Sequence, residues 1–305
     1  MTDYEKFLES KAATAISSGF DFPTEEMNPM MFDWQKDIVR WALRKGRAAL
    51  FENCGCGKSV QQLEWSKRIN ERTNKPILIL APLSVTEQTK REGDKFGYEV
   101  NVVRQNAEIV NGINITNYEI LEHFDVSQFG GVVLDESSIL KAFTGKIRNE
   151  IIESFDRTPY KLSCTATPAP NDFMELGNQC EFLGVMSRTE MLATYFTHDG
   201  GETSKWRLKG HAEERFWEWV ASWAVVLTNP SDLGYDGKDY VLPKLNMIQK
   251  IVYSEIGEVE GQLMMVPKTA ETLSERREAR RDSLERRVNL ACDIAKTLMR
   301  GFTVE

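Results

Sequence analysis

A short glycine-rich segment carries the residues best suited to hold an anion. Residues 51–59 read Phe-Glu-Asn-Cys-Gly-Cys-Gly-Lys-Ser. Glycines let backbone N–H groups close around phosphate oxygens where a Cβ would collide. Lys58 would then lie against the β- and γ-phosphates of a nucleoside triphosphate, and the Ser59 hydroxyl would ligate magnesium. The strict phosphate-loop pattern has glycine at the position of Glu52, so an ordinary glycine turn is the alternative.

The segments on either side fit a phosphate loop. Ala48–Phe51 is a short apolar run that predicts a buried strand, and the residues from Ser59 onward predict a helix with one polar face. A strand, a glycine loop and a helix in this order are what such a loop requires, because the positive end of the helix points at the same anion. Besides Lys58 and Ser59, the predicted cofactor-binding residues here are Glu52, Gly55, Cys56 and Gly57.

A second constellation lies about eighty residues further on. Val132–Leu134 predicts another buried strand, and Asp135 and Glu136 follow it directly. In ATP hydrolysis a carboxylate at this place holds magnesium, and a neighbouring glutamate orients and deprotonates the attacking water. We therefore expect Asp135 as a metal ligand and Glu136, with Lys58, as catalytic residues. A surface Asp-Glu pair at the end of a strand is the alternative.

Two weaker signals gain weight from these neighbours. Thr165 and Thr167 follow a third apolar run, Leu162–Cys164, and their hydroxyls could couple the Asp135/Glu136 loop to the state of the γ-phosphate. Gln35 belongs to a Trp-Gln pair upstream of the first strand. A glutamine amide can pair with both the donor and acceptor edges of adenine, which predicts a role in base selection.

The composition excludes several classes of protein. The chain has 305 residues, 41% of them hydrophobic, which is enough for one large or two modest domains. The net charge of −8 gives no general basic field, so nucleic-acid binding would need a local basic surface. Five scattered cysteines do not form a disulfide framework or a paired zinc pattern. Without a signal sequence or a membrane-spanning apolar run, we expect a soluble, cytoplasmic protein that has no membrane partner.

The middle of the chain alternates short apolar runs with polar helical stretches. Continuous apolar runs are typical of strands buried on both faces of a parallel sheet, and their carboxyl ends form the edge where such folds bind ligands. Further runs are Ile77–Ala81, Val100–Val103 and Ile113–Thr116. Later, Phe216–Trp223 predicts a Trp-rich helix whose spacing favours packing over base stacking, and 273–298 predicts one long helix.

Six arginines lie between Arg276 and Arg287, among acidic residues. They could grip nucleic-acid phosphates, each adding salt-dependent affinity. A solvated helix face with i,i+4 ion pairs is the alternative, and it is favoured by the interleaved carboxylates.

Taken in order, these motifs resemble a superfamily 2 helicase or translocase, of the Swi/Snf-like DEAD/DEAH-box branch found in phages and prophages. The resemblance spans roughly residues 30–287. It rests on six ordered segments: Trp34-Gln35, Glu52 with Gly55-Cys-Gly-Lys-Ser59, Leu80-Ala-Pro-Leu83, Ile115-Thr-Asn-Tyr118, Asp135-Glu136, and Ser163 with Thr165-Ala-Thr-Pro168. An acidic residue at the place of Glu52 resembles the Asp that begins the loop in Swi/Snf relatives, whereas Cys56 stands where the family usually has leucine.

The resemblance implies a RecA-like P-loop α/β domain with a mostly parallel sheet, a helical extension, and ATP- and Mg²⁺-dependent movement on nucleic acid. It also implies that Pro82-Leu83 and Thr116-Asn117 border the nucleic-acid path. The expected domains are a helical leader (1–27), a RecA-like lobe (28–187), a mostly helical insertion (188–250), and a linker with the first helix of a truncated second lobe (251–305). No Gln-x-x-Gly-Arg-x-x-Arg segment supplies the arginine finger of a second lobe.

The predicted function is therefore the ATP-binding lobe of a nucleic-acid translocase with weak turnover alone. Its partners would be DNA, with RNA as the alternative, and whatever supplies the second lobe. Two alternatives remain open: a nucleotide-gated nucleic-acid-binding module with negligible turnover, and a P-loop ATPase that acts on protein.

Overall fold

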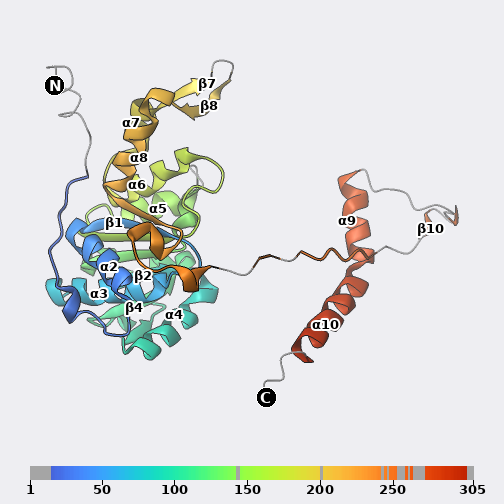
Figure 1. Cartoon of the computed structure of the whole chain (residues 1–305), viewed down its shortest axis with the longest axis horizontal. Helices are drawn as coiled ribbons and strands as arrows, with labels where there is room; N and C mark the ends of the chain where they lie inside the picture. The colour runs from blue at the N-terminus through green and yellow to red at the C-terminus, as the bar shows by residue number, and fades with distance from the viewer. Residues whose placement is uncertain are drawn as a thin grey trace. The chain divides into compact units, whose positions relative to one another are not determined.

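The predicted apolar runs form a sheet of seven strands that all run parallel (Figure 1). In this computed structural model the described residues are 15–141, 145–199, 202–241, 244–245, 247–252, 258–259, 262–263 and 272–300. Across the sheet the strand order is β3-β4-β2-β5-β6-β1-β9. The strands are β1 (Arg47–Glu52), β2 (Ile77–Ala81), β3 (Val100–Val102), β4 (Ile113–Asn117), β5 (Gly131–Asp135), β6 (Tyr160–Thr165) and β9 (Ala224–Leu227).

Helices cover both faces of the sheet, which explains why its strands are continuously apolar. Leu50 faces the core beneath α2 (Asp33–Lys45) and α3 (Lys58–Thr73), and α4 (Leu83–Phe96) packs against β3 and β4 at that side. Its neighbour Phe51 faces the opposite core. That second layer contains α5 (Lys146–Ser154), α6 (Leu176–Leu183), α7 (Arg188–Tyr195) and α8 (Glu213–Ala221). The predicted α/β class with a parallel sheet is confirmed.

The region expected to be a mostly helical insertion also contributes to the sheet. Besides α7 and α8 it contains the hairpin β7 (Phe196–Asp199) and β8 (Glu202–Leu208), and its strand β9 pairs in parallel with β1. The Trp-rich helix is core, as its spacing indicated, because Phe216, Trp219 and Trp223 are all buried. Trp219 lies 5.4 Å from Trp223 between ring centroids, in an edge-to-face arrangement.

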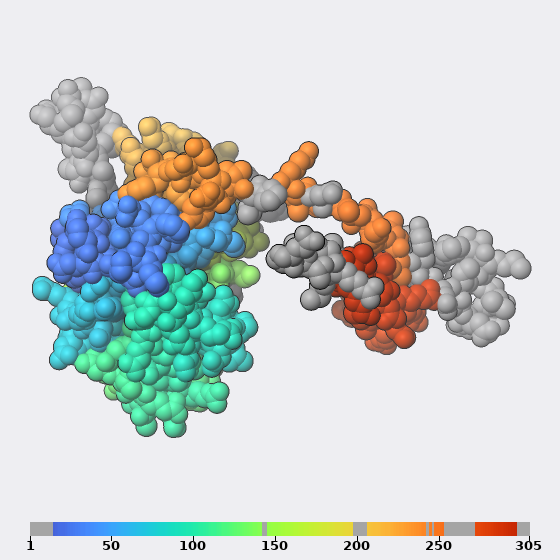
Figure 2. Space-filling model, turned by 60° about the horizontal axis from the view of Figure 1, so that its bottom comes forward, coloured from blue at the N-terminus to red at the C-terminus, as the bar shows by residue number. Residues whose placement is uncertain are grey.

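The chain after β9 returns to the helix that carries Gln35. The Tyr235 hydroxyl donates to the carboxylate of Asp37, and the rings of Trp34 and Tyr240 meet edge to face at 5.8 Å. Figure 2 shows these later residues, in orange, lying against the N-terminal segment, in blue. Two segments about two hundred residues apart in the sequence therefore form one surface beside the start of the sheet.

A separate unit begins near residue 243, whereas residues up to Leu242 form the larger unit. It contains the short pair β10 (Glu258–Val259) and β11 (Gln262–Leu263), then α9 (Leu273–Asp282) and α10 (Leu284–Arg300). The expected single helix is thus divided at Ser283. The Ser283 hydroxyl donates to the carbonyl of Ala279 at 2.7 Å, a bond back to the preceding turn that bends helices.

Short 3-10 turns complete the described structure: η1 (Thr24–Glu26), η2 (Asn106–Glu108), η3 (Tyr118–His123), η4 (Val126–Gln128), η5 (Ser137–Lys141), η6 (Phe173–Glu175), η7 (Gly210–Ala212), η8 (Pro230–Leu233) and η9 (Lys238–Tyr240). Of the expected helical leader, residues 1–14 lie outside the described residues, and 15–27 contain η1. Within the described part of the chain, none of the helices combines the length and the apolar character needed to cross a bilayer.

Candidate active site

The glycine loop, residues 53–57, connects the carboxyl end of β1 to the first residue of α3. Gly55 and Gly57 have φ values of 86° and 77°, in the left-handed region that side chains with a Cβ rarely adopt. A Cβ on Gly55 would meet open space, whereas one on Gly57 would lie 2.5 Å from the Gln35 amide nitrogen. The loop therefore needs glycine for its backbone at both positions and for close packing at Gly57.

Lys58 opens α3 and its side chain folds back over the loop. Its ammonium donates to the carbonyls of Glu52 at 2.9 Å and Asn53 at 3.2 Å. Ser59 follows in the first helical turn and is half-buried. The unpaired N–H groups of this turn give a positive end that suits an anion. Loop, lysine and serine are thus held at one place.

Glu52 is fully buried at the end of β1. One of its carboxylate oxygens accepts a hydrogen bond from the Gln61 amide at 2.8 Å, and the other has no partner among the described residues. Burial raises the pKa of Glu52 to about 7, opposed by the Gln61 bond and the Lys58 charge. Beside it, burial also raises the pKa of the Cys56 thiol, which keeps that thiol protonated at neutral pH.

Gln35 lies beneath the loop with both ends of its amide engaged. Its oxygen accepts from the Phe32 N–H at 3.0 Å, which caps α2, and its nitrogen donates to the Cys56 carbonyl at 2.9 Å. The side chain is 4% exposed. In this arrangement Gln35 fixes the position of the loop relative to α2.

Asp135 ends β5 and is buried, with 7% of its surface exposed. The Gln62 amide of α3 donates to its carboxylate at 2.8 Å, and the Tyr118 hydroxyl donates to its backbone carbonyl at 2.7 Å. Burial raises the pKa of Asp135, while the Gln62 bond and the charge of Lys58 lower it. The carboxylate is therefore oriented from α3 and lies within the electrostatic reach of Lys58.

Glu136 adopts a left-handed backbone conformation, with a φ of 55°. Such a conformation costs a residue with a Cβ about 1–2 kcal/mol, and residues of this kind cluster at functional sites. Its carboxylate accepts a hydrogen bond from the Thr165 hydroxyl at 3.3 Å, and that hydroxyl accepts from the Thr167 N–H at 3.1 Å. Thr165 therefore connects the Glu136 carboxylate to the backbone of Thr167.

The sheet register explains this convergence. Asp135 of β5 pairs with Cys164 of β6, and Thr165 pairs with Phe51 of β1. Parallel strands in this order end at one edge, so the glycine loop, the carboxylates and the two threonines meet there. The sequence motifs identify these residues, and the strand order β5-β6-β1 brings them together.

Several supporting residues were not predicted. Gln61 and Gln62 lie buried on α3 and bind Glu52 and Asp135. Gln179 of α6 accepts from the Ser163 hydroxyl at 2.5 Å and donates to the Ser137 carbonyl at 3.0 Å, which fixes the loop after Glu136. The adjacent glutamines one residue after Lys58-Ser59 are the one sequence signal that could have indicated the first two.

The residues predicted to border nucleic acid lie on the other half of the same edge. Ala81 of β2 pairs with Asn117 of β4, so Pro82 and Asn117 leave adjacent strand ends. Leu83 is 69% exposed, whereas Thr116 is buried and its hydroxyl has no partner among the described residues. Of these two side chains, only that of Leu83 is therefore open to an external partner.

A divalent cation has few protein ligands available here. Among the described residues no group of three or more His, Cys, Asp or Glu side chains could hold a metal by itself. The Ser59 hydroxyl and Asp135 carboxylate are oxygen donors at the loop, and Mg²⁺ commonly uses one or two protein oxygens with phosphates and waters. The donor set therefore fits magnesium bound together with a phosphate ligand.

Comparisons with known proteins identify the fold. The SWI2/SNF2 ATPase core of Sulfolobus solfataricus, solved in complex with double-stranded DNA, superposes with a TM-score of 0.56 at 19% identity, covering 68% of this chain and 46% of that one. The same core domain in a second structure gives 0.51 at 17%, covering 70% and 48%. The UvsW helicase of bacteriophage T4 gives 0.43 at 18%, covering 61% and 66%, which is too low to establish a common fold.

The likeness establishes the fold: this chain has a RecA-like α/β fold, as the SWI2/SNF2 ATPase core does. This chain spans about half the length of the SWI2/SNF2 structures, 46% and 48%. No protein-family model and no curated protein sequence matches it.

Proposed function

We propose that this chain is the ATP-binding lobe of a helicase-type translocase that couples ATP hydrolysis to movement on DNA. The observation that carries the proposal is the meeting of Lys58, Asp135 and Glu136 at one edge of the sheet. Gln62, on the helix that follows the glycine loop, orients the buried Asp135 carboxylate by a hydrogen bond. A glycine turn with no ligand would not need such a carboxylate.

In this proposal each residue has a separate task. Lys58 and the loop N–H groups bind the β- and γ-phosphates, and Ser59 with Asp135 holds Mg²⁺. When bound, the ion would supply positive charge against the phosphate oxygens. Glu136 accepts a proton from the attacking water, and Thr165 holds the carboxylate in place. Through Thr165 and Thr167, a change at the phosphate reaches the loop after β6.

The nucleic-acid partner enters by the Pro82, Leu83, Thr116 and Asn117 end of the sheet, with DNA proposed over RNA. Two observations support it: the exposed Leu83 at this edge, and the double-stranded DNA in the complex of the SWI2/SNF2 core. The phage or prophage branch and a cytoplasmic place of action remain part of the same proposal.

A second RecA-like lobe, on another polypeptide or a further segment, would complete the site. The chain spans 46% of the SWI2/SNF2 core it resembles, which fits one lobe of two. A missing arginine finger lowers turnover by about 10³–10⁵ in related phosphoryl-transfer enzymes, so we expect slow hydrolysis by this chain alone.

Phosphate release tests the proposal most simply. The purified chain is mixed with ATP and Mg²⁺, with and without duplex DNA, single-stranded DNA or RNA, and with a polypeptide that supplies a second lobe. We expect slow turnover alone, and stimulation by DNA once the second lobe is present. Turnover of several per second without any partner contradicts the single-lobe account.

The competing functions give different results in the same assay. Stimulation by unfolded or native protein but by no nucleic acid identifies an ATPase that acts on protein. ATP-dependent DNA binding without turnover under any condition identifies a nucleotide-gated binding module.

A further inference from the structure

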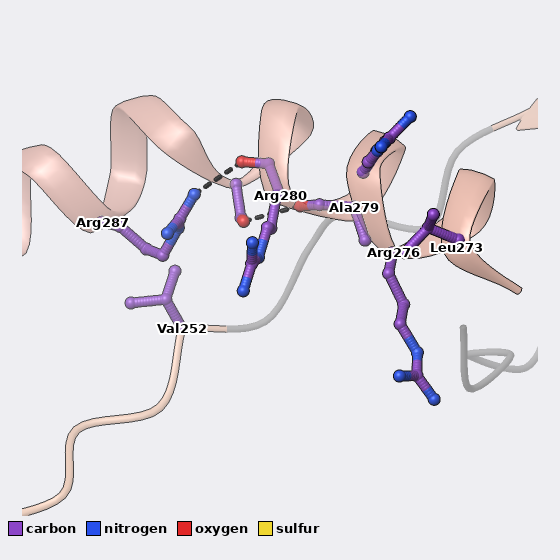
Figure 3. Close-up of a pocket in the computed structure, with 8 residues that line it drawn as sticks. Val252, Leu273, Arg276, Ala279, Arg280 and Arg287 are labelled. Atoms are coloured by element: carbon purple, nitrogen blue, oxygen red, sulfur yellow. Dashed lines mark hydrogen bonds between the residues drawn. The ribbon is translucent and has the colours of Figure 1, made fainter. Parts of the chain in front are cut away.

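The helix pair of the smaller unit carries a cluster of exposed arginines. Arg276, Arg277, Arg280 and Arg287 are all exposed and line a hollow of about 670 Å³ together with Val252 and Leu273. Figure 3 shows Arg276 and Arg280 extending from the same side of α9. Six arginines occur within residues 276–287, which is the densest basic stretch of the chain.

Their spacing places three of them on one face. Arg276, Arg280 and Arg287 follow one another at intervals of four and seven residues, which recur on one side of a helix. The helical hydrogen bonds continue across the junction, from Ser283 N–H to Ala279 and from Arg287 N–H to Ser283. The i,i+4 hydrogen-bond pattern therefore continues through the bend at Ser283, and residues on either side of it keep their helical spacing. Arg276, Arg280 and Arg287 form what we call the arginine face.

The acidic residues lie on the other side. Glu275, Glu278, Asp282 and Glu285 fall about 120–180° away around the helix from the centre of the arginine face, at 3.6 residues per turn. A helix whose charged residues served only i,i+4 ion pairs would have positive and negative side chains on every face. Arg281 and Arg286 lie among these acidic residues, whereas the arginine face contains no carboxylate and therefore attracts anions.

The Arg287 guanidinium also orders the end of α9. It donates to the Arg280 carbonyl at 2.6 Å, a dashed contact in Figure 3, and so satisfies one of the carbonyls left open at a helix terminus. The bond holds Arg287 against the last turn of α9. Arg276 and Arg280 remain one helical turn apart, about 6 Å along the axis.

We infer that the arginine face binds the phosphate backbone of double-stranded DNA. From Arg276 to Arg287 the face extends about 16 Å, over which a duplex presents roughly ten phosphate charges. Guanidinium groups match phosphate oxygens in a fork geometry. Residues 272–297 contain no Phe, Tyr or Trp, so this helix lacks the aromatic platforms that bind the bases of a single strand.

This surface is distinct from the nucleotide site. It belongs to the smaller unit, whereas Lys58, Asp135 and Glu136 belong to the larger one. Its binding of DNA is therefore expected without ATP. Variants of the arginine face should leave nucleotide binding unchanged, which separates a failure of this inference from a failure of the proposed function.

The test compares two double variants of the full chain that change net charge equally. Arg276→Gln/Arg280→Gln alters the face, and Arg281→Gln/Arg286→Gln alters arginines that point elsewhere on the same helices. Arginine and glutamine have similar helix propensity, so both variants should fold, which circular dichroism checks. Arg287 is left intact because it supports the junction.

Affinity for a labelled duplex is measured by fluorescence anisotropy over a range of salt, without nucleotide. We expect the face variant to bind about tenfold or more weakly at low salt, with the slope of log K against log salt reduced by about two, one for each arginine. The control variant should change the slope by less than half as much.

Four outcomes overturn the inference. They are equal slope changes in both variants, no change in either, single-stranded DNA or duplex RNA bound as tightly as duplex DNA, and displacement of the duplex by polyglutamate at equal charge concentration. The last result would assign the face to an acidic protein instead.

Discussion

The glycine loop and the arginine face both place positive charge where phosphate would bind, yet they are built in opposite ways. The loop works with one lysine, backbone N–H groups and carboxylates that are nearly or fully buried. The arginine face consists of exposed guanidinium groups, and helical spacing alone places them on one side. In a buried site each residue is hard to replace, whereas on an exposed face each arginine contributes a small, salt-dependent part of the binding free energy.

The largest expected effect is at Glu136. Glu136→Gln should lower DNA-stimulated turnover by about 10²–10⁴-fold, because the amide cannot accept the proton of the attacking water, while nucleotide affinity stays within about twofold. Turnover is measured as phosphate release, with binding followed separately. Glu278→Gln on α9 is the matched control and should change neither. If turnover of Glu136→Gln equals that of the unaltered chain, Glu136 is not the base.

Glu52 gives the next largest effect, on stability. Its pKa of about 7 in the folded state exceeds the ordinary glutamate value of 4.5. The folded state thus holds the proton more tightly, so the stability from Glu52 is lost as pH rises from about 4.5 to about 7. Glu52→Gln should be more stable than the unaltered chain at pH 8, by on the order of 3 kcal/mol at most.

Urea unfolding at several pH values measures this difference. It should shrink as pH falls through 7 and nearly vanish near pH 4.5. A difference independent of pH would show that Glu52 stays ionised in the folded protein.

Backbone strain at Glu136 predicts a smaller effect. Because its φ is 55°, Glu136→Gly should relieve strain and be about 1 kcal/mol more stable than Glu136→Ala, which keeps a Cβ. Both lack the carboxylate, so the comparison isolates the backbone. Denaturant midpoints measure it, and equal stabilities would argue that the left-handed conformation costs nothing.

The smallest effect belongs to the arginine face. Arg276→Gln and Arg280→Gln should each alter the free energy of unfolding by less than about 0.5 kcal/mol, because both side chains are exposed on a helix. The same denaturant titration measures this. A larger loss would mean that the face supports folding and would weaken its interpretation as a binding surface.

Much of the larger unit could be predicted from the sequence because local apolar runs identify buried strands. The runs at 77–81 and 113–116 lie in β2 and β4, and the helix after Ser59 is α3. Strand β9 was missed, because four residues, Ala224–Leu227, become a sheet strand only by pairing with β1 far earlier in the chain. Sequence patterns do not encode such pairings.

The site shows the same division. Lys58, Asp135 and Glu136 could be selected from the sequence, because a glycine-loop lysine and an Asp-Glu pair after predicted strands indicate phosphate and metal chemistry. Gln179 resembles an ordinary helical glutamine in the sequence, and the pair Gln61-Gln62 indicates at most a polar site, so only the contacts with Ser163 and Asp135 reveal what Gln179 and Gln62 position. The left-handed backbone of Glu136 likewise depends on the surrounding fold.

The central claim, that the glycine loop and its lysine hold a triphosphate with magnesium, is tested most directly by equilibrium binding of ATP with and without Mg²⁺. Lys58→Ala should weaken binding by about 100-fold or more in both conditions, consistent with loss of a charge-assisted contact. Lys67→Ala, an exposed lysine on the same helix, should bind like the unaltered chain. Unchanged affinity in Lys58→Ala would contradict the account.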